Sequence, residues 1–268
     1  MVAVASGRVS RPHRGCFALP AAQWSSVQAR VMSAQLTCVS ALRPWGLPTP
    51  QTYNGLHLAI PEHRGFVDGD RRLRDGMRMH RLGAPQSAEL LAPVRDVLDH
   101  LGLCTTRVDQ LAAIDAALRL GLMSRADIAS FTATPLDVRR WLAGQAEPLT
   151  QSPRETRARI ELRADGLFVQ AQAKLPGLGH ADLLVENDIV VECDGFNFHN
   201  DKEAFEEDRR RDRACELLGL GRLRFTGAEI MASEGEIAAG VRTLMAIRQR
   251  QSRVPGAQVT GVTGLGPR

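Results

Sequence analysis

Two short apolar runs joined by a polar turn constrain the fold of this chain more than any other feature of its sequence. The runs extend from Ala181 to Val185 and from Ile189 to Cys193, and the turn between them is Glu186-Asn187-Asp188. Valine, isoleucine and leucine dominate both runs, which is typical of the two strands of a β-hairpin. A hairpin with this turn at its centre places Asp182 opposite Glu192, with Cβ atoms roughly 4.5–5.5 Å apart.

Acidic side chains gather at the open end of this hairpin. Asp194 follows Glu192 by two residues, so both side chains point to the same face of the strand. Together with Asp182 they form a group of carboxylates that repel one another and lose hydration when buried. No Lys or Arg occurs between Ala181 and His199, and we therefore expect a divalent cation as the counter-charge. Oxygen ligands favour Mg²⁺ or Mn²⁺, and His199 is near enough to act as a general acid or base.

An alternative explanation of the same residues involves no chemistry. In this explanation Asp182 and Asp194 are turn residues at the ends of strands, and Glu192 faces solvent. Three β-branched residues precede Glu192 directly, and they favour a buried strand instead.

Six segments of the second half form a recognisable pattern. They are Ala181-Asp182-Leu183-Leu184-Val185, Val190-Val191-Glu192-Cys193-Asp194-Gly195, Phe198-His199, Phe205-Glu206-Glu207-Asp208-Arg209-Arg210-Arg211-Asp212-Arg213, Leu217-Leu218-Gly219 and Leu223-Arg224-Phe225-Thr226. Together they resemble the endonuclease-like domain related to very-short-patch-repair endonucleases, a branch of the PD-(D/E)XK nuclease superfamily. The resemblance covers about Ser152 to Arg250.

This resemblance implies an α/β, restriction-endonuclease-like fold, in which helices flank a mixed sheet. It implies metal-dependent hydrolysis of a DNA phosphodiester, with Asp182 and Glu192 as metal ligands and the backbone carbonyl of Cys193 facing the metal. His199 would activate water or protonate the leaving oxygen. The superfamily pattern ends in Glu-x-Lys, whereas the third position here is Asp194. Very-short-patch-repair enzymes also lack this lysine and rely on histidines.

A helix that precedes the first core strand contributes another acidic candidate. Ser152 and Pro153 open this helix, and Glu155 occupies the third helical position of a capping box. That role explains Glu155 completely as a structural residue. In nucleases of the superfamily a helical acid at the matching position often joins the metal site, so both roles stay open.

The charged segment after His199 predicts a helix from Glu203 to Leu218. On it, Glu206–Arg210 and Glu207–Arg211 have the spacing of i,i+4 ion pairs in the favourable order. The resemblance implies that part of this arginine cluster approaches DNA phosphates, and we expect Arg209 and Arg213 to do so.

The N-terminal segment carries basic residues next to an apolar run. Arg8 to Pro20 predicts a β-hairpin with a basic tip, similar to the wing of the winged-helix segment in AbiEi-type antitoxin proteins. Arg11 and Arg14 are the candidate DNA contacts, although a surface hairpin with solvated arginines explains them equally well. Further expected elements are a helix over Val27–Ala41, a strand over Leu56–Pro61, helices over 86–101, 107–121 and 125–130, strands over Leu167–Lys174 and Arg222–Thr226, and a helix over Ser233–Arg250.

The charge distribution differs between the two halves of the chain. Residues 1–150 hold 17 Arg and no Lys against 12 acidic residues, whereas residues 151–268 have a net charge of −1. A basic first half beside an acidic site fits a polyanion-binding module joined to a metal site. Arginine usage that follows genomic base composition explains the basic half as well.

Cysteine usage and hydropathy bear on three further questions, which are a zinc site, the redox compartment and a membrane span. The five cysteines show no CxxC pair and no zinc spacing, so a structural zinc is not expected. An odd cysteine count without a disulfide framework favours a reducing, cytoplasmic setting. No apolar run approaches the roughly 20 residues of a membrane span, so no membrane partner is expected.

We therefore expect three regions, which are a partial winged-helix and helical region (1–150), a nuclease domain (151–250) and a disordered tail (251–268). The predicted function is a metal-dependent DNA endonuclease in repair or defence, and a homodimer is possible. The main alternative is a non-catalytic DNA-binding regulator that reuses the nuclease fold, and an RNA-directed nuclease is a weaker one. An arginine side chain plugging the carboxylate site would favour the regulator.

Overall fold

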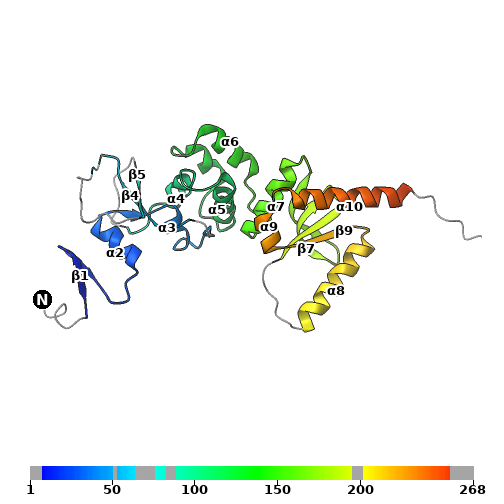
Figure 1. Cartoon of the computed structure of the whole chain (residues 1–268), viewed down its shortest axis with the longest axis horizontal. Helices are drawn as coiled ribbons and strands as arrows, with labels where there is room; N and C mark the ends of the chain where they lie inside the picture. The colour runs from blue at the N-terminus through cyan, green and yellow to red at the C-terminus, as the bar shows by residue number, and fades with distance from the viewer. Residues whose placement is uncertain are drawn as a thin grey trace, which may run out of the picture. The chain divides into compact units, whose positions relative to one another are not determined.

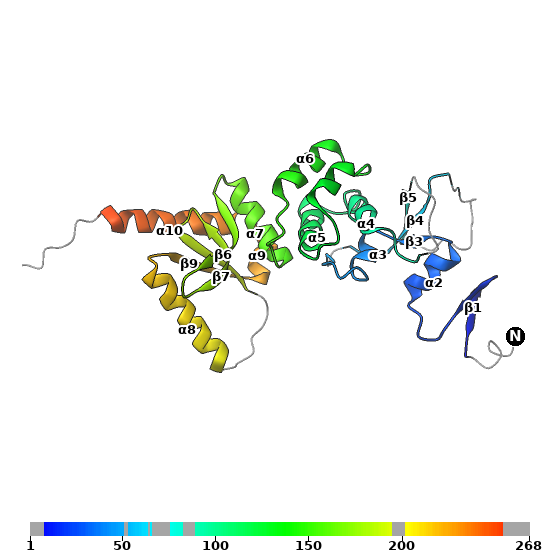
Figure 2. The ribbon, with the colours of Figure 1, turned by 180° about the vertical axis from the view of Figure 1, so that it is seen from behind.

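The structure is a computed structural model that describes residues 8–50, 53–63, 65, 76–82, 89–194 and 202–253. Internal contacts divide the chain into two compact units, Met1–Arg157 and Ala158–Arg268. Both units combine helices with a sheet, so the predicted mixed α/β class is confirmed (Figures 1 and 2). Among the described residues, no helix has both the length and the apolar character needed to cross a bilayer.

The N-terminal unit begins with a β-hairpin, as the basic segment predicts. Strands β1 (Ser10–His13) and β2 (Cys16–Ala18) pair antiparallel. Gly15 in the turn has φ 80°, a conformation that glycine adopts without steric cost. Arg11 and Arg14 are both exposed on this hairpin.

The single helix predicted over Val27–Ala41 is wrong. The chain instead forms α2 (Trp24–Val31), strand β3 (Gln35–Leu36) and α3 (Val39–Leu42). Ser33 and Cys38 have φ values of 45° and 50°, which take the backbone out of the helical conformation twice. Strand pairing explains the break, because β3 forms an antiparallel ladder with the next strand, and pairing with another segment overrides local helix propensity.

A three-stranded sheet follows from this pairing. It has the order β3–β4–β5, with β4 at Leu56–Pro61 as predicted and β5 at Met77–Leu82. Strands β4 and β5 are parallel. The remainder of the unit is helical, with α4 (Val94–Leu101), α5 (Arg107–Arg119), the 3₁₀ helix η1 (Arg125–Ser130) and α6 (Leu136–Gln145).

Helix α4 begins later than the predicted start at residue 86. The backbone N–H of Ala92 donates to the carbonyl of Leu36 at 2.9 Å, and the N–H of Leu36 donates to the carbonyl of Leu90 at 2.8 Å. These bonds hold the segment before α4 beside β3 in an extended conformation. The position of helix α6 was not predicted.

Asp99 stabilises the helical part of this unit from within α4. Its buried carboxylate accepts backbone N–H groups of Thr132, Ala133 and Thr134 at 2.7, 2.9 and 2.7 Å. Asp99→Ala leaves these donors without an acceptor, so we expect a loss of about 2–4 kcal/mol in the free energy of unfolding. Urea unfolding checks this, with the exposed Asp137→Ala expected to change stability by less than about 0.5 kcal/mol. Equal midpoints for the two variants would contradict this role.

The C-terminal unit is built on a four-stranded mixed sheet. Its order is β6–β7–β8–β9, in which the first two pairs are antiparallel and the last is parallel. The strands are β6 (Val169–Leu175), β7 (Gly179–Val185), β8 (Ile189–Asp194) and β9 (Gly221–Thr226). The helices are α7 (Pro153–Ala164), which begins in the N-terminal unit, α8 (Lys202–Leu217), α9 (Gly227–Ala232) and α10 (Glu236–Arg253).

Helices cover both faces of this sheet. On one face, Val185 and Val191 belong to an apolar cluster that includes residues of α7, α9 and α10. On the other face, Leu184 and Val190 belong to a cluster with Ala214 and Cys215 of α8 (Figure 1). Side chains of β8 alternate between these faces, so Glu192 follows Val190 onto the face that α8 covers.

Candidate functional site

The β7–β8 hairpin has the predicted register at its closed end. Leu183, Leu184 and Val185 pair with Val191, Val190 and Ile189. Glu186 and Asn187 have φ values of 52° and 54°, and two successive positive φ angles are typical of the tight turn that matches the twist of a hairpin. The defined ladder ends one residue short of the predicted Asp182–Glu192 pair.

Asp182 lies where this ladder ends. Its Oδ2 accepts the backbone N–H of Cys193 at 2.8 Å. In a regular ladder a backbone carbonyl of the neighbouring strand would accept a hydrogen bond of this kind. Its Oδ1 accepts Gln172 Nε2 at 3.4 Å, and Gln172 has φ 49° at a skipped position of the β6–β7 ladder. A local irregularity in two adjacent ladders therefore holds this carboxylate at the sheet.

Glu192 is buried, with 5% of its surface exposed. An Nη2 atom of Arg211 lies 2.5 Å from its Oε1, and Nη2 of Arg222 lies 3.9 Å from the same oxygen. The sequence predicts a divalent cation as the counter-charge of this carboxylate, and the structure shows a further source of positive charge, because arginines from α8 and β9 lie beside Glu192. Both arginines follow His199 in the sequence and so lie outside the segment from Ala181 to His199, which contains no Lys or Arg.

The surroundings of Glu192 act on the pKa of its carboxyl in opposite directions. Burial raises the pKa of its carboxyl above the ordinary value of 4.5, the hydrogen bond and charge of Arg211 oppose that rise, and the negative charge of Asp182 adds to it. The net effect is a raised pKa. The charge of Asp182 therefore acts on the carboxyl of Glu192, as expected of neighbouring carboxylates.

Arg211 is fixed by three acceptors. In addition to Glu192, its guanidinium donates to the carbonyl oxygens of Leu178 at 3.0 Å and His180 at 3.1 Å. It therefore fastens α8 to β7 and β8. The predicted Glu207–Arg211 pair is wrong, since Glu207 pairs with Arg210 at 2.5 Å in an i,i+3 arrangement.

More ion pairs continue from this site along α8 and β9. Asp208 pairs with Arg224 through two hydrogen bonds, and Asp212 pairs with Arg222. The Nε atom of Arg222 is buried and has no hydrogen-bond partner among the described residues. These pairs set the position of α8 against the sheet, and with it the position of Arg211.

The remaining predicted residues of the nuclease site have different placements. Asp194 lies in β8, where its backbone is in register with Thr226, and its side chain is not among those described. The side chain of Cys193 lies in the apolar cluster on the opposite face from α8. His199 lies outside the described residues.

Glu155 occupies the capping position that its spacing predicts. Its backbone N–H donates to Ser152 Oγ at 3.2 Å, and its carboxylate accepts the N–H of Gln151 at 2.9 Å. It is 4% exposed and belongs to the N-terminal unit. Capping therefore accounts for this carboxylate locally.

The arginines predicted to bind nucleic acid belong to two different units of the chain. Arg209 and Arg213 line an open depression of about 480 Å³ on α8, together with Asp208, Asp212 and Glu216. In the N-terminal hairpin, the guanidinium carbon of Arg11 lies 5.8 Å from the centroid of the Phe17 ring. The mixed charges of the depression weaken its attraction for a polyanion.

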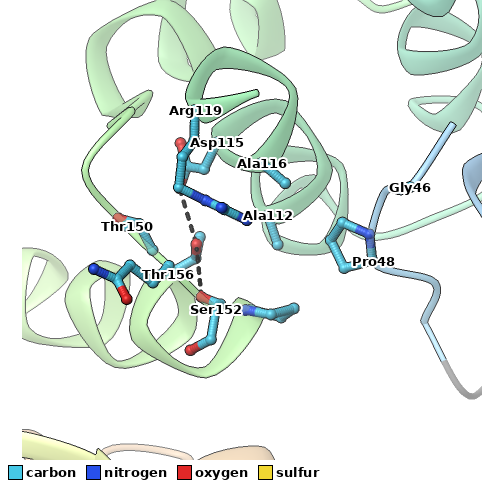
Figure 3. A pocket seen from close by; sticks show the side chains of 11 residues that line it. Gly46, Pro48, Ala112, Asp115, Ala116, Arg119, Thr150, Ser152 and Thr156 are labelled. Atoms are coloured by element: carbon cyan, nitrogen blue, oxygen red, sulfur yellow. Dashed lines mark hydrogen bonds between the residues drawn. The ribbon is translucent and has the colours of Figure 1, made fainter. Parts of the chain in front are cut away.

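A separate small cavity of about 190 Å³ lies in the N-terminal unit (Figure 3). Asp115 on its wall accepts the backbone N–H of Glu147 at 2.7 Å and the hydroxyl of Thr156 at 2.9 Å. Thr156 also bonds to the carbonyl of Ser152 at 3.4 Å. The polar groups of this wall thus join the start of α7 to α5, and none of the predicted site residues lines it.

Comparisons of the chain with protein-family models, with curated proteins and with solved structures found no match.

Proposed function

We propose that the C-terminal unit hydrolyses DNA phosphodiester bonds at a divalent-metal site formed by Asp182 and Glu192. The observation that carries this proposal is the meeting of two carboxylates from neighbouring strands, where the β7–β8 ladder ends. The mixed sheet flanked by helices agrees with the restriction-endonuclease-like fold that the sequence resemblance implies.

The residues present are suited to Mg²⁺ or Mn²⁺. Both side chains offer carboxylate oxygens, which these cations prefer. A carboxylate oxygen has two lone pairs, so Asp182 Oδ2 can accept the N–H of Cys193 and still bind a cation. Both arginine contacts of Glu192 fall on Oε1. A bound metal would lower the pKa of water and stabilise the charge that develops on the phosphorus oxygens.

Arg211 has a defined part in this proposal. It compensates the charge of Glu192 while no cation is bound. This pairing reduces the free-energy cost of burying a carboxylate next to Asp182. A guanidinium at this position also matches the geometry of a phosphate group, so it can bind a DNA phosphate when it leaves Glu192. Asp194 and His199 remain the proposed partners for water and the leaving oxygen.

A non-catalytic DNA-binding regulator is the second candidate. The 2.5 Å ion pair between Arg211 and Glu192 favours it, because an arginine fixed on the acidic site hinders metal binding. The two functions are separated by incubating the purified chain with supercoiled plasmid and mismatched duplex, with and without Mg²⁺ or Mn²⁺. Metal-dependent nicking supports the nuclease, and binding without nicking supports the regulator.

Arg209 and Arg213 allow a test of the proposed DNA partner. If each contacts one phosphate, the double variant Arg209→Gln/Arg213→Gln should lower the salt dependence of binding by about 2 in the slope of log K against log salt. Fluorescence anisotropy with a labelled duplex, between about 50 and 200 mM salt and without added divalent metal, measures that slope. The exposed Arg140→Gln is the matched control. A slope for the double variant that equals the slope for Arg140→Gln would exclude these contacts.

A further inference from the structure

Four side chains that are typical metal ligands meet inside the N-terminal unit. They are Cys38, His57, His80 and Cys104, and their ligand atoms all lie within 4.8 Å of one another. Cys38 directly precedes α3, His57 lies on β4, His80 lies on β5, and Cys104 follows α4. The first three are buried and Cys104 is half-buried.

We propose that these four side chains, named here the Cys/His cluster, bind one zinc ion in a closed structural site. A set of two sulfur and two nitrogen ligands is typical of tetrahedral zinc. Because all four positions are filled by protein, the ion has no open position for substrate. The site would serve stability, independently of the proposed nuclease site.

The distances within the cluster agree with a tetrahedron. His57 Nδ1 lies 3.1 Å from His80 Nε2, and Cys104 Sγ lies 3.7 Å from the same nitrogen. A tetrahedral zinc with ordinary bond lengths separates two nitrogens by about 3.3 Å and a nitrogen from a sulfur by about 3.6 Å. The side chains therefore need only small movements to bind the ion.

The charges of the cluster also fit a divalent cation. Two thiolates and two neutral imidazoles together with Zn²⁺ give a site of zero net charge, which suits a buried position.

Neighbouring residues hold the ligands in place. The ring of His100 stacks on that of His80 at 4.8 Å between centroids, and its Nδ1 lies 2.8 Å from Thr37 Oγ1. The backbone N–H of His57 donates to Ser40 Oγ at 2.9 Å. Such partners orient the ligands of metal sites.

The backbone at Cys38 supports a functional constraint. Its φ of 50° and ψ of −138° lie in a region that residues other than glycine rarely adopt. Unfavourable backbone conformations persist where the surroundings impose them, and they gather at functional sites.

The expectation that no zinc site exists rested on sequence spacing alone. Folding overturns its premise, because β4, β5 and the end of α4 bring together residues that are far apart in the chain. A zinc ion there would link the three-stranded sheet to two helices. Zinc would thus stabilise the N-terminal unit, in which strand β3 contains only two residues.

Metal analysis of the full-length chain, purified under reducing conditions, tests this proposal. We expect one zinc per chain in the wild type, and a loss of most of it in Cys38→Ser and in His80→Asn. The buried thiol of Cys215 provides the matched control, and Cys215→Ser and Asp182→Asn should both retain the metal. A zinc content that is the same in all of these proteins would overturn the proposal.

A second measurement needs no variant that could fail to fold. Wild-type chain stripped of metal under reducing conditions should bind Co²⁺ with the intense d–d bands of tetrahedral coordination and a sulfur-to-cobalt charge-transfer band. A chelator should also lower the melting temperature of the wild type. Absence of the cobalt bands would overturn the site, and so would a Cys38–Cys104 disulfide detected by mass spectrometry in the reduced preparation.

Discussion

Arg211→Ala is expected to destabilise the C-terminal unit by about 2–4 kcal/mol at neutral pH. The variant removes the closest cation from Glu192, which is only 5% exposed, and leaves a buried carboxylate beside Asp182. Removing one partner of a buried ion pair costs more than the pair contributes, because the other charge stays behind without compensation. Chemical unfolding followed by circular dichroism measures the loss.

The pH dependence of this loss identifies its cause. Without Arg211 the folded-state pKa of Glu192 rises further above its ordinary value of 4.5. A carboxyl with a raised folded pKa contributes stability below its unfolded pKa and loses that contribution as the pH rises through the folded pKa. The difference between Arg211→Ala and the wild type should therefore shrink towards pH 4.5 and grow towards neutral pH.

The neighbouring arginine provides a matched control. Arg210 pairs with Glu207 on the surface, with side-chain exposures of 47% and 50%, so Arg210→Ala should cost no more than about 1 kcal/mol. The double variant Arg211→Ala/Glu192→Gln should recover part of the stability, since it also removes the unpaired carboxylate. Equal losses for Arg210→Ala and Arg211→Ala would contradict the buried ion pair.

Glu192→Gln is expected to reduce metal-dependent DNA cleavage by at least about 100-fold, since a direct metal ligand supplies several kcal/mol of transition-state stabilisation. Glutamine keeps the size of the side chain but removes the charge that would hold the cation. In the wild type, the raised pKa of Glu192 means that protons compete with metal at acidic pH. The cleavage rate should therefore fall as the pH decreases through that pKa and level off above it.

Single-turnover cleavage at several pH values, with saturating Mn²⁺, checks this expectation. Arg211→Ala should shift the acidic limb of the profile to higher pH, because the pKa of Glu192 rises when the arginine is removed. The exposed Asp137→Asn should leave the profile unchanged. Cleavage by Glu192→Gln at the wild-type rate would remove Glu192 from the site.

The local elements of the second half could be predicted because short-range signals determine them. The β7–β8 hairpin has two apolar runs and a polar turn, and the ladder at its closed end has the register that this pattern predicts. The Ser152-Pro153 start of α7 likewise follows from capping chemistry. In both cases the residues that decide the structure lie within a few positions of one another.

Prediction failed where distant segments meet. The helix expected over Val27–Ala41 is broken because Gln35 and Leu36 pair with β4, more than 20 residues away. The guanidinium that pairs with Glu192 belongs to Arg211 on helix α8, which follows Glu192 by 19 residues in the sequence. The Cys/His cluster likewise combines ligands from β4, β5 and the ends of two helices, so no spacing rule could detect it.

The proposed site of phosphodiester hydrolysis consists of Asp182 and Glu192. Single-turnover nicking of supercoiled plasmid in Mn²⁺ by Asp182→Asn, beside wild type and the exposed Asp137→Asn, tests it most directly. We expect nicking by wild type and Asp137→Asn, and a loss of at least about 100-fold in Asp182→Asn with unchanged DNA binding. Nicking by Asp182→Asn at the wild-type rate, or binding without nicking in all three proteins, would contradict it.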